Sequence, residues 1–242
     1  VPSSPAAAAG LKPLDILVEL GGERIAVNQD ADTVFRRRTG VCAGYANLYR
    51  ALGRAAGLDV VYLVGNVRDE RGALAGSGHA WNAVKVDGRW LLVDATWDAG
   101  YLEDGRFVPR YRTSYLFAPP EAFRLDHLPR EDSWQLHPQP LSRGDFLRQP
   151  QLRLEARAMN LDLVQPTTPQ ITARDTVRVE LSNPDRHALT ARIDDERCTV
   201  TEARFIDCPE RPGGNHQLRL FAAPSPGATH YVHVGSVTVQ GS

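Results

Sequence analysis

Several features that commonly reveal a protein's class are scarce in this sequence of 242 residues. No apolar run approaches the ~20 residues that a membrane-spanning helix needs, so we expect no transmembrane segment. The 28 basic side chains nearly balance the 29 acidic ones, which leaves a formal net charge of −1 at pH 7. Because so even a balance produces no broad electrostatic field, it gives no reason to expect nucleic acid or an anionic membrane as a partner.

Metal-binding patterns are also scarce. The sequence has three cysteines but no CxxC or HxxxH pair, and it has no acidic loop with the spacing of an EF-hand. Zinc sites normally draw on such Cys and His pairs, and many calcium sites on such loops. We therefore expect no metal and no cofactor, with zinc bound by the Cys, His and Asp residues described below as the rival interpretation.

The sequence does contain a cysteine at the predicted start of a helix. Thr39 and Gly40 interrupt the preceding segment, and apolar residues then recur at helical spacing, at Tyr45, Leu48, Tyr49, Leu52, Ala55 and Ala56. Cys42 is thus expected in the first helical turn, where unpaired backbone N–H groups and the helix dipole favour an anion. This setting should lower the pKa of the thiol and help to hold an oxyanion.

A β-hairpin is predicted farther along the chain. Residues 78–86 and 89–96 are rich in β-branched and aromatic side chains, and Asp87-Gly88 between them is a strong two-residue turn signal. Such a turn makes Val86 oppose Arg89, Trp81 oppose Asp94, and His79 oppose Thr96. His79 and Asp94 then become diagonal neighbours on one face, with Cα atoms about 7–8 Å apart. A turn one residue longer would move Asp94 to the other face.

Cys42, His79 and Asp94 together have the chemistry of a thiol catalytic site. Asp94 would accept a hydrogen bond from one ring nitrogen of His79, and the other nitrogen would take the thiol proton. The thiolate could then attack an amide or ester carbonyl. Each residue alone also fits a structural role, as a small buried residue, a satisfied histidine or a cap. Their joint order, helix then strand then strand, favours catalysis.

Around these residues the sequence resembles the transglutaminase-like superfamily, and within it the bacterial relatives of kyphoscoliosis peptidase. The resemblance covers roughly residues 30–137 and rests on Gly40-Val-Cys-Ala-Gly-Tyr-Ala, His79-Ala-Trp-Asn, Asp87-Gly-Arg-Trp, Val93-Asp-Ala-Thr-Trp, Tyr115-Leu-Phe-Ala-Pro-Pro-Glu-Ala-Phe, His127-Leu-Pro and Trp134-Gln-Leu. It implies an α+β fold in which the helix carrying the cysteine packs on an antiparallel sheet. The family includes cross-linkers, peptidases, amidases and inactive proteins, so membership does not choose among these roles.

The second donor to an oxyanion is not assigned by the sequence. Many members of the family have a longer helical segment before the cysteine helix, and this region supplies that donor, but it is short here. Asn28 and Gln29 are available amides that suit a turn equally well.

Residues around the histidine are candidates for contact with a substrate. Gly78 directly precedes His79, and Trp81 and Trp97 could wall a groove because they flank the predicted site. The glycine-containing loop 69–78 could form a lid, although an ordinary exposed connection would look the same.

Cys198 and Cys208 are spaced like the ends of a short β-hairpin. A disulfide between them would leave Cys42 as a free thiol and would require an oxidising compartment, whereas two reduced, buried cysteines are the alternative. The chain starts at Val1 with a Pro/Ala/Ser-rich stretch, as a mature form behind a removed signal would, and an artificial chain start would look the same. We expect a secreted or periplasmic protein.

The chain changes character near residue 145. Beyond the prolines at 138, 140 and 150, helical periodicity gives way to short runs that alternate apolar and polar residues, at 152–156, 176–181, 189–193, 199–206, 217–221 and 231–239. This predicts a catalytic domain over residues 1–145 and an all-β sandwich over residues 146–242. The family resemblance implies an immunoglobulin-like accessory domain, which could bind an extracellular or cell-envelope partner.

The sequence therefore predicts acyl transfer from a protein or peptide substrate through a thioester on Cys42. The family resemblance favours water as the acceptor, which would make the protein a cysteine peptidase or amidase. If the acceptor is an amine, the protein is a cross-linking transglutaminase. The competing class is a non-catalytic binding protein on the same fold, although a binder would need none of the three residues.

Overall fold

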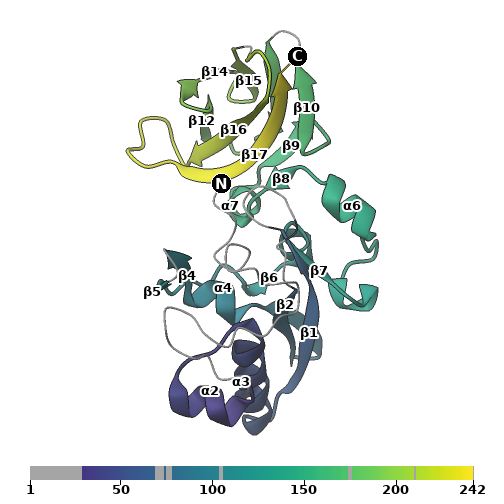
Figure 1. The fold of residues 1–242 in the computed structure, drawn as a ribbon. Coiled ribbons are helices and arrows are strands. Elements are labelled where there is room, and N and C mark those ends of the chain that lie inside the picture. The colour runs from purple at the N-terminus through teal and green to yellow at the C-terminus, as the bar shows by residue number, and fades with distance from the viewer. Residues whose placement is uncertain are drawn as a thin grey trace. The chain divides into compact units, whose positions relative to one another are not determined.

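A computed structural model describes residues 29–68, 74, 78–103, 106–173, 176–209 and 211–241. These residues form two compact units, the first ending at Leu141 and the second beginning at Ser142 (Figure 1). The Pro/Ala/Ser-rich start, Asn28 and most of the predicted lid lie outside the described residues. Within the described part, no helix is long and apolar enough to span a membrane.

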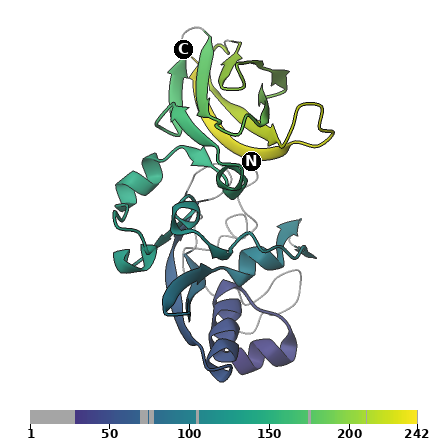
Figure 2. The ribbon, with the colours of Figure 1, turned by 180° about the vertical axis from the view of Figure 1, so that it is seen from behind.

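A five-stranded antiparallel sheet forms the centre of the first unit. Its spatial order is β6-β3-β2-β1-β7, and its strands are β1 (Asp59–Val67), β2 (His79–Val86), β3 (Arg89–Val93), β6 (Leu116–Ala118) and β7 (His127–Pro129). Helix α3 (Cys42–Ala55) packs on β1 and β2, and helix α2 (Ala31–Arg37) packs on α3. Figure 2 shows these purple helices beside the blue and teal strands. The unit is thus of the predicted α+β class.

Short elements complete the first unit. They are α4 (Ala95–Ala99), β4 (Gly100–Glu103), β5 (Arg106–Pro109), α5 (Pro120–Phe123) and a 3₁₀ helix (Asp132–Gln135). Under α3, the core contains Val60, Val84 and Val93, with the half-buried ring of Tyr49 from the helix packed against them. Removal of this apolar surface from water holds the helix on the sheet.

The β2–β3 hairpin has the predicted register. Its residue pairs run from Val86 and Arg89 at the turn to Asn82 and Val93 at the other end. Asp87 has a φ angle of 49°, as the first central residue of a type I′ turn requires. The two-residue turn therefore fixes which side chains share a face.

The second strand of the hairpin is shorter than predicted, so the expected pairing of His79 with Thr96 is wrong. Strand β3 ends at Val93, and Asp94 is the N-cap of α4. The backbone N–H groups of Thr96 and Trp97 lie in the first helical turn and have no acceptor within the helix, and both donate to the Asp94 carboxylate. Because Asp94 caps α4 in this way, the chain leaves the sheet after Val93.

Gly65 allows the edge strand β7 to lie close beside β1. It pairs with His79 on its β2 side. A Cβ atom at Gly65 would lie 2.1 Å from the carbonyl oxygen of Leu128 in β7 and 2.5 Å from the ring of Trp81. The absence of a side chain here thus brings the strand that begins at His127 close to the middle of the sheet.

Two β-sheets dominate the second unit. The larger sheet has the order β10-β17-β16-β12-β13, with β8 also paired to β17, and the smaller has the order β14-β15-β11-β9. Only β10 runs parallel to its neighbour among the described strands. The elements are α6 (Arg143–Arg148), β8 (Gln151–Leu152), α7 (Leu154–Ala158), β9 (Asp162–Gln165), β10 (Gln170–Ala173), β11 (Val177–Ser182), β12 (Ala188–Ile193), β13 (Glu196–Arg197), β14 (Thr199–Thr201), β15 (Phe205–Cys208), β16 (Asn215–Ala223) and β17 (Val232–Gly241).

Two of the alternating runs differ from their predicted form. Most of the run at 152–156 belongs to α7, because Leu, Glu, Ala and Arg are strong helix formers and the helix buries Ala156. The run at 199–206 is divided into β14 and β15 by a turn at Glu202 and Ala203. This hairpin places Cys198 opposite Cys208, and the two form a disulfide.

We expect Gly65→Ala to destabilise the first unit by about 1–3 kcal/mol, because the new methyl group would overlap the β7 backbone and Trp81. All four tryptophans lie between residues 81 and 134, so their fluorescence during urea unfolding reports on this unit. Gly144→Ala is a suitable control, since its methyl group would meet only the flexible end of Arg148. An unchanged unfolding midpoint for Gly65→Ala would contradict the close approach of β7.

Candidate active site

Cys42 is the first residue of α3. The N–H group of the preceding Val41 donates to Oε1 of Gln29 at 3.0 Å. Gly44 leaves room for that side chain, because a Cβ at Gly44 would lie 2.4 Å from the same oxygen. The half-buried thiol therefore stands at the positive end of the helix, where the dipole favours a thiolate.

Asn82 joins this helix to the strand that carries the histidine. Its Nδ2 group donates to the carbonyl oxygen of Ala46 in α3 at 3.0 Å and to that of Val61 in β1 at 3.1 Å. The side chain is buried, and buried hydrogen bonds of this kind are costly to break. Asn82 thus holds Cys42 and His79, which belong to different elements, at a fixed separation.

His79 and Asp94 lie in direct contact, as diagonal neighbours on the hairpin should. Nε2 of His79 is 2.6 Å from Oδ2 of Asp94, whose side chain is fully buried. Oδ1 of Asp94 accepts the two backbone hydrogen bonds of the α4 cap, at 2.9 and 3.1 Å. Because Nε2 is bonded to Asp94, Nδ1 is the ring nitrogen left to hydrogen-bond the Cys42 thiol.

The three side chains shift one another's pKa values so that the charged form of each is favoured. Burial would raise the pKa of the Cys42 thiol, but the hydrogen bond and charge of His79 outweigh it and lower that pKa. Burial would lower the pKa of His79, but Asp94 and Cys42 raise it to about 10. Burial also opposes ionisation of Asp94, and hydrogen bonds from His127 and His79 still hold its pKa well below the usual range. All three shifts favour a thiolate–imidazolium pair.

His127 is a member of the site that the sequence did not assign. Its Nε2 lies 3.1 Å from Oδ2 of Asp94, and its Nδ1 lies 2.5 Å from Oδ1 of Asp126. Asp126 also accepts a hydrogen bond of 2.6 Å from the hydroxyl of Tyr115. The His127-Leu-Pro motif was part of the family resemblance, but no local pattern gives its histidine a role, because the contact depends on the pairing of β7 with β1.

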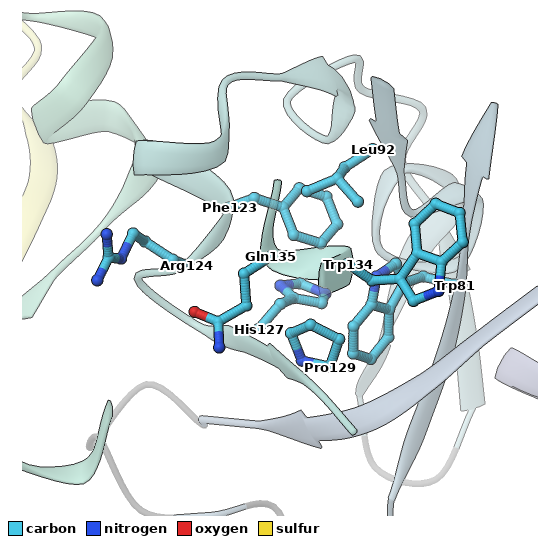
Figure 3. A pocket seen from close by; sticks show the side chains of 8 residues that line it. All are labelled: Trp81, Leu92, Phe123, Arg124, His127, Pro129, Trp134 and Gln135. Carbon is cyan, nitrogen blue, oxygen red and sulfur yellow. The ribbon is translucent and has the colours of Figure 1, made fainter. Parts of the chain in front are cut away.

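Aromatic rings surround His127. The ring centroids of Phe123, Trp97 and Trp81 lie 4.3, 4.5 and 5.1 Å from that of the imidazole. Figure 3 shows the rings of Phe123, His127 and Trp81 around a crevice that is too narrow to hold a water molecule. Water is thus excluded from this face of the imidazole. The lining residues are Trp81, Leu92, Phe123, Arg124, His127, Pro129, Trp134 and Gln135.

The three predicted substrate-binding residues all lie around His79. Trp97 is half-buried, and its ring centroid lies 5.5 Å from that of the His79 imidazole. Gly78, which directly precedes His79 in the chain, is also half-buried. Trp81 is 1% exposed and packs against His79 and His127. Trp97 and Gly78 therefore keep accessible surface beside the thiol site, and Trp81 has little. Contact of the three with a substrate remains a prediction.

His79, Asp94 and His127 are also a group of the residue types that bind metals, with ligand atoms within 4.8 Å of one another. Ligands at about 2.05 Å from a tetrahedral zinc ion lie roughly 3.3 Å apart. The separation of 2.6 Å between His79 and Asp94 is much shorter than that, and it is typical of a charge-assisted hydrogen bond. The arrangement therefore fits a hydrogen-bonded chain better than shared coordination of a metal.

Comparison with known proteins agrees with this fold and with these motifs. Residues 20–95 match the family model "Transglutaminase-like superfamily". The chain is 30% identical over 202 residues to kyphoscoliosis peptidase of Mus musculus and of Homo sapiens, an alignment that covers 78% of this chain and 31% of each relative. The chain therefore belongs to the transglutaminase-like superfamily and has kyphoscoliosis peptidase among its relatives. It spans about a third of the length of these curated relatives.

Two further similarities cover less of the chain. The Lim and transglutaminase domain protein ltd-1 of Caenorhabditis elegans is 32% identical over 97 residues, which are 36% of this chain and 13% of the relative. Among solved structures, the fibronectin(III)-like modules of Clostridium thermocellum CbhA match 34% of this chain and 94% of their own, with 14% identity and a TM-score of 0.27. That TM-score is too low to support an argument.

The raised pKa of His79 predicts how stability depends on pH. Its folded-state value of about 10 exceeds its ordinary value of 6.5, so its contribution is complete below about pH 6.5 and is lost as pH rises through about 10. In Cys42→Ser protein the thiol no longer titrates and its part of the shift is removed, but Asp94 still raises the pKa of His79, so the unfolding free energy of the first unit should fall as pH rises above about 6.5. Adding Asp94→Asn should reduce the fall, because a neutral amide stabilises the imidazolium less.

Tryptophan-monitored urea unfolding at several pH values measures both slopes. The remaining slope in the double variant reports on His127, which keeps Asp126 as a partner. Identical slopes with and without the Asp94 carboxylate would contradict its assignment as the group that raises the pKa of His79.

Proposed function

We propose that this protein performs thiol-dependent acyl transfer on a peptide or amide, through a thioester on Cys42. The observation that carries the proposal is the 2.6 Å contact between His79 and Asp94, together with the interaction with His79 that lowers the pKa of the Cys42 thiol. A nucleophile, its base and an orienting carboxylate need to interact in this order. Trp97 and Gly78, which keep accessible surface beside His79, are the proposed walls of the substrate groove.

In the first half of the proposed reaction, the Cys42 thiolate attacks the carbonyl carbon. A carbon–sulfur bond forms while the carbonyl π electrons move to oxygen. His79 then gives its proton to the amide nitrogen as the carbon–nitrogen bond breaks, which leaves a thioester and a neutral imidazole. In the second half, His79 takes a proton from the acceptor that attacks the thioester, and the thiolate is expelled. Asp94 remains ionised and orients the imidazole throughout.

The first turn of α3 is the proposed source of oxyanion stabilisation. Backbone N–H groups at a helix start are unpaired donors, and that of Ala43 lies close enough to the thiol to help to lower its pKa. Gln29 lies beside the same turn, anchored through its Oε1 to Val41, and is the described candidate for a second donor.

Water is the acceptor that we propose. The relatives that align with most of this chain carry the name peptidase, whereas the shorter match to ltd-1 carries a transglutaminase domain in its name. Cross-linking would require a groove that presents an amine and limits access of water. A binding protein would need neither the activated thiol nor the buried carboxylate beneath it, since burial of charged groups costs several kcal/mol unless they are well paired.

We also propose a secreted or periplasmic location. The disulfide between Cys198 and Cys208 fits an oxidising compartment, because cytosolic reductants keep most thiols reduced. Residues 146–242, which we propose to be an immunoglobulin-like accessory domain, would there be available to an extracellular or cell-envelope partner.

Iodoacetamide should alkylate Cys42 rapidly below pH 7, because His79 lowers the pKa of the thiol. In His79→Ala the rate below pH 7 should fall at least about tenfold, since a rise of one pKa unit reduces the thiolate fraction tenfold. Asp94→Asn should lie between the two. Mass spectrometry of the alkylated peptide measures the rates, and disulfide-bonded Cys198 and Cys208 serve as unlabelled internal controls. Slow labelling that is equal in the three proteins would rule out an activated thiol.

Competition between water and an amine distinguishes the two enzyme classes. A peptide acyl donor incubated with the protein and a primary amine should give mainly the free carboxylic acid, because we propose water as the acceptor. Mass spectrometry resolves the acid from the amine adduct, and Cys42→Ala should form neither product. A predominant amine adduct would show that the protein is a transglutaminase instead.

A further inference from the structure

The hydrogen bonds of His127 define its protonation state. Both of its ring nitrogens face carboxylates, Nε2 toward Asp94 and Nδ1 toward Asp126, and its side chain is 1% exposed. An ionised carboxylate accepts hydrogen bonds but donates none, so each of these nitrogens must carry a proton. Geometry therefore identifies His127 as an imidazolium, provided that both carboxylates are ionised.

Asp94 is ionised on the same grounds. Its Oδ1 accepts two backbone N–H groups, and its Oδ2 accepts from the imidazoles of His79 and His127. The two backbone groups can only donate, and hydrogen bonds from both imidazoles hold the pKa of Asp94 well below its usual range, so the carboxylate is ionised. Asp126 accepts a hydrogen bond from the Tyr115 hydroxyl through Oδ2, and its Oδ1 is the oxygen that faces Nδ1 of His127.

The surroundings of His127 also suit a cation. The ring centroids of Phe123, Trp97 and Trp81 lie 4.3, 4.5 and 5.1 Å from that of its imidazole. Aromatic rings can stabilise a nearby cation when water is excluded, which compensates in part for the loss of hydration. His127 is thus a buried charge with a carboxylate partner on each side.

We propose that His127 is a positioning residue that stays protonated, holds the Asp94 carboxylate in place and supplies a positive charge that favours the Cys42 thiolate over the thiol. This inference rests on the proposed function, because its effect reaches the reaction only through Asp94 and His79. His127 itself does not reach the thiol through any described contact.

The signs of the charges explain the need for this residue. Cys42, His79, Asp94, His127 and Asp126 form a row in which negative and positive groups alternate. Asp94 lies on the far side of His79 from the thiol, so its negative charge opposes ionisation of the thiol in part. With the charge on His127, the charge of Asp94 is shared between two imidazolium groups, and the thiolate feels more of the charge of His79.

The charged and titratable groups around this row come from each neighbouring element. His79 in β2 lies with its ring 5.7 Å from that of His127, Asp94 precedes α4, and Asp126 precedes β7. Asp98 of α4, which accepts from the backbone of Tyr115, is a further buried carboxyl group near Asp94. Burial raises the pKa of Asp98, against the hydrogen bond from the Tyr115 backbone and the charge of Arg112, which lower it.

Two substitutions separate the charge of His127 from its hydrogen bond. His127→Gln retains a side-chain N–H for Asp94 but is neutral, and His127→Phe removes both. In His127→Gln, the apparent pKa of Cys42 from iodoacetamide labelling should rise by about one unit, which is about tenfold slower labelling below that pKa. His127→Phe should show a larger rise. His216→Gln is the matched control, because it removes a His–Asp pair of 2.8 Å in the second unit, and it should leave labelling unchanged.

The protonation state of His127 can also be measured in the unsubstituted protein, so this test does not require any variant to fold. Nitrogen-15 NMR of the histidine rings should show both nitrogens of His127 protonated from about pH 6 to pH 8, as in an imidazolium. A neutral His127 in these spectra, or labelling profiles of folded His127→Gln identical to those of the unsubstituted protein, would overturn the inference. Slow labelling of Cys42 in the unsubstituted protein would instead refute the proposed function, so the two failures are distinct.

Discussion

The buried carboxylate of Asp94 is the group on which the rest of the site depends. It is fully buried and accepts hydrogen bonds from Thr96, Trp97, His79 and His127. A carboxylate taken out of water without such partners would be strongly unfavourable and would bind a proton instead. Since its four partners come from α4, β2 and β7, the charge at this one position requires three parts of the first unit to be assembled correctly.

Local sequence features create this convergence. The type I′ turn at Asp87 sets the register of β2 and β3 and so places His79 near the end of β3. Gly65 lets β7 approach until His127 reaches the same carboxylate, and Asn82 ties α3 to the sheet so that the Cys42 thiol meets the other side of His79. Each device fixes one distance. Side chains held in this way need little reorganisation when charge develops during a reaction.

The sequence predicted this site to the extent that local rules could define it. The helix start at Cys42 and the hairpin register follow from breaker residues and a two-residue turn, so both were correct. The predicted strand ran three residues too far, because a residue that leaves a sheet to cap a helix looks locally like the end of a strand. His79 and Asp94 nevertheless meet, since the pairs up to Asn82 and Val93 already determine the shared face.

His127 was not predictable in the same way, and neither was α7. The role of His127 depends on β7 pairing with β1, which lies about sixty residues earlier in the chain, and no local periodicity encodes such a contact. The segment that became α7 alternates Leu with Arg and Glu, a pattern that suits a strand as well as a helix until packing of Ala156 decides. Both cases show tertiary contacts overriding a short local pattern.

The charged row favours the proposed catalytic role of the site over a role in stability alone. Replacing a buried ionic network by apolar residues of similar volume is often neutral or stabilising, by about 1–4 kcal/mol. A domain that needed only a firm core could fill the space around His127 with more rings like Phe123 and Trp81, which already pack there. Ionised groups that alternate in sign and end at a half-buried thiol provide something that apolar packing cannot, which is an electrostatic field directed at one sulfur atom.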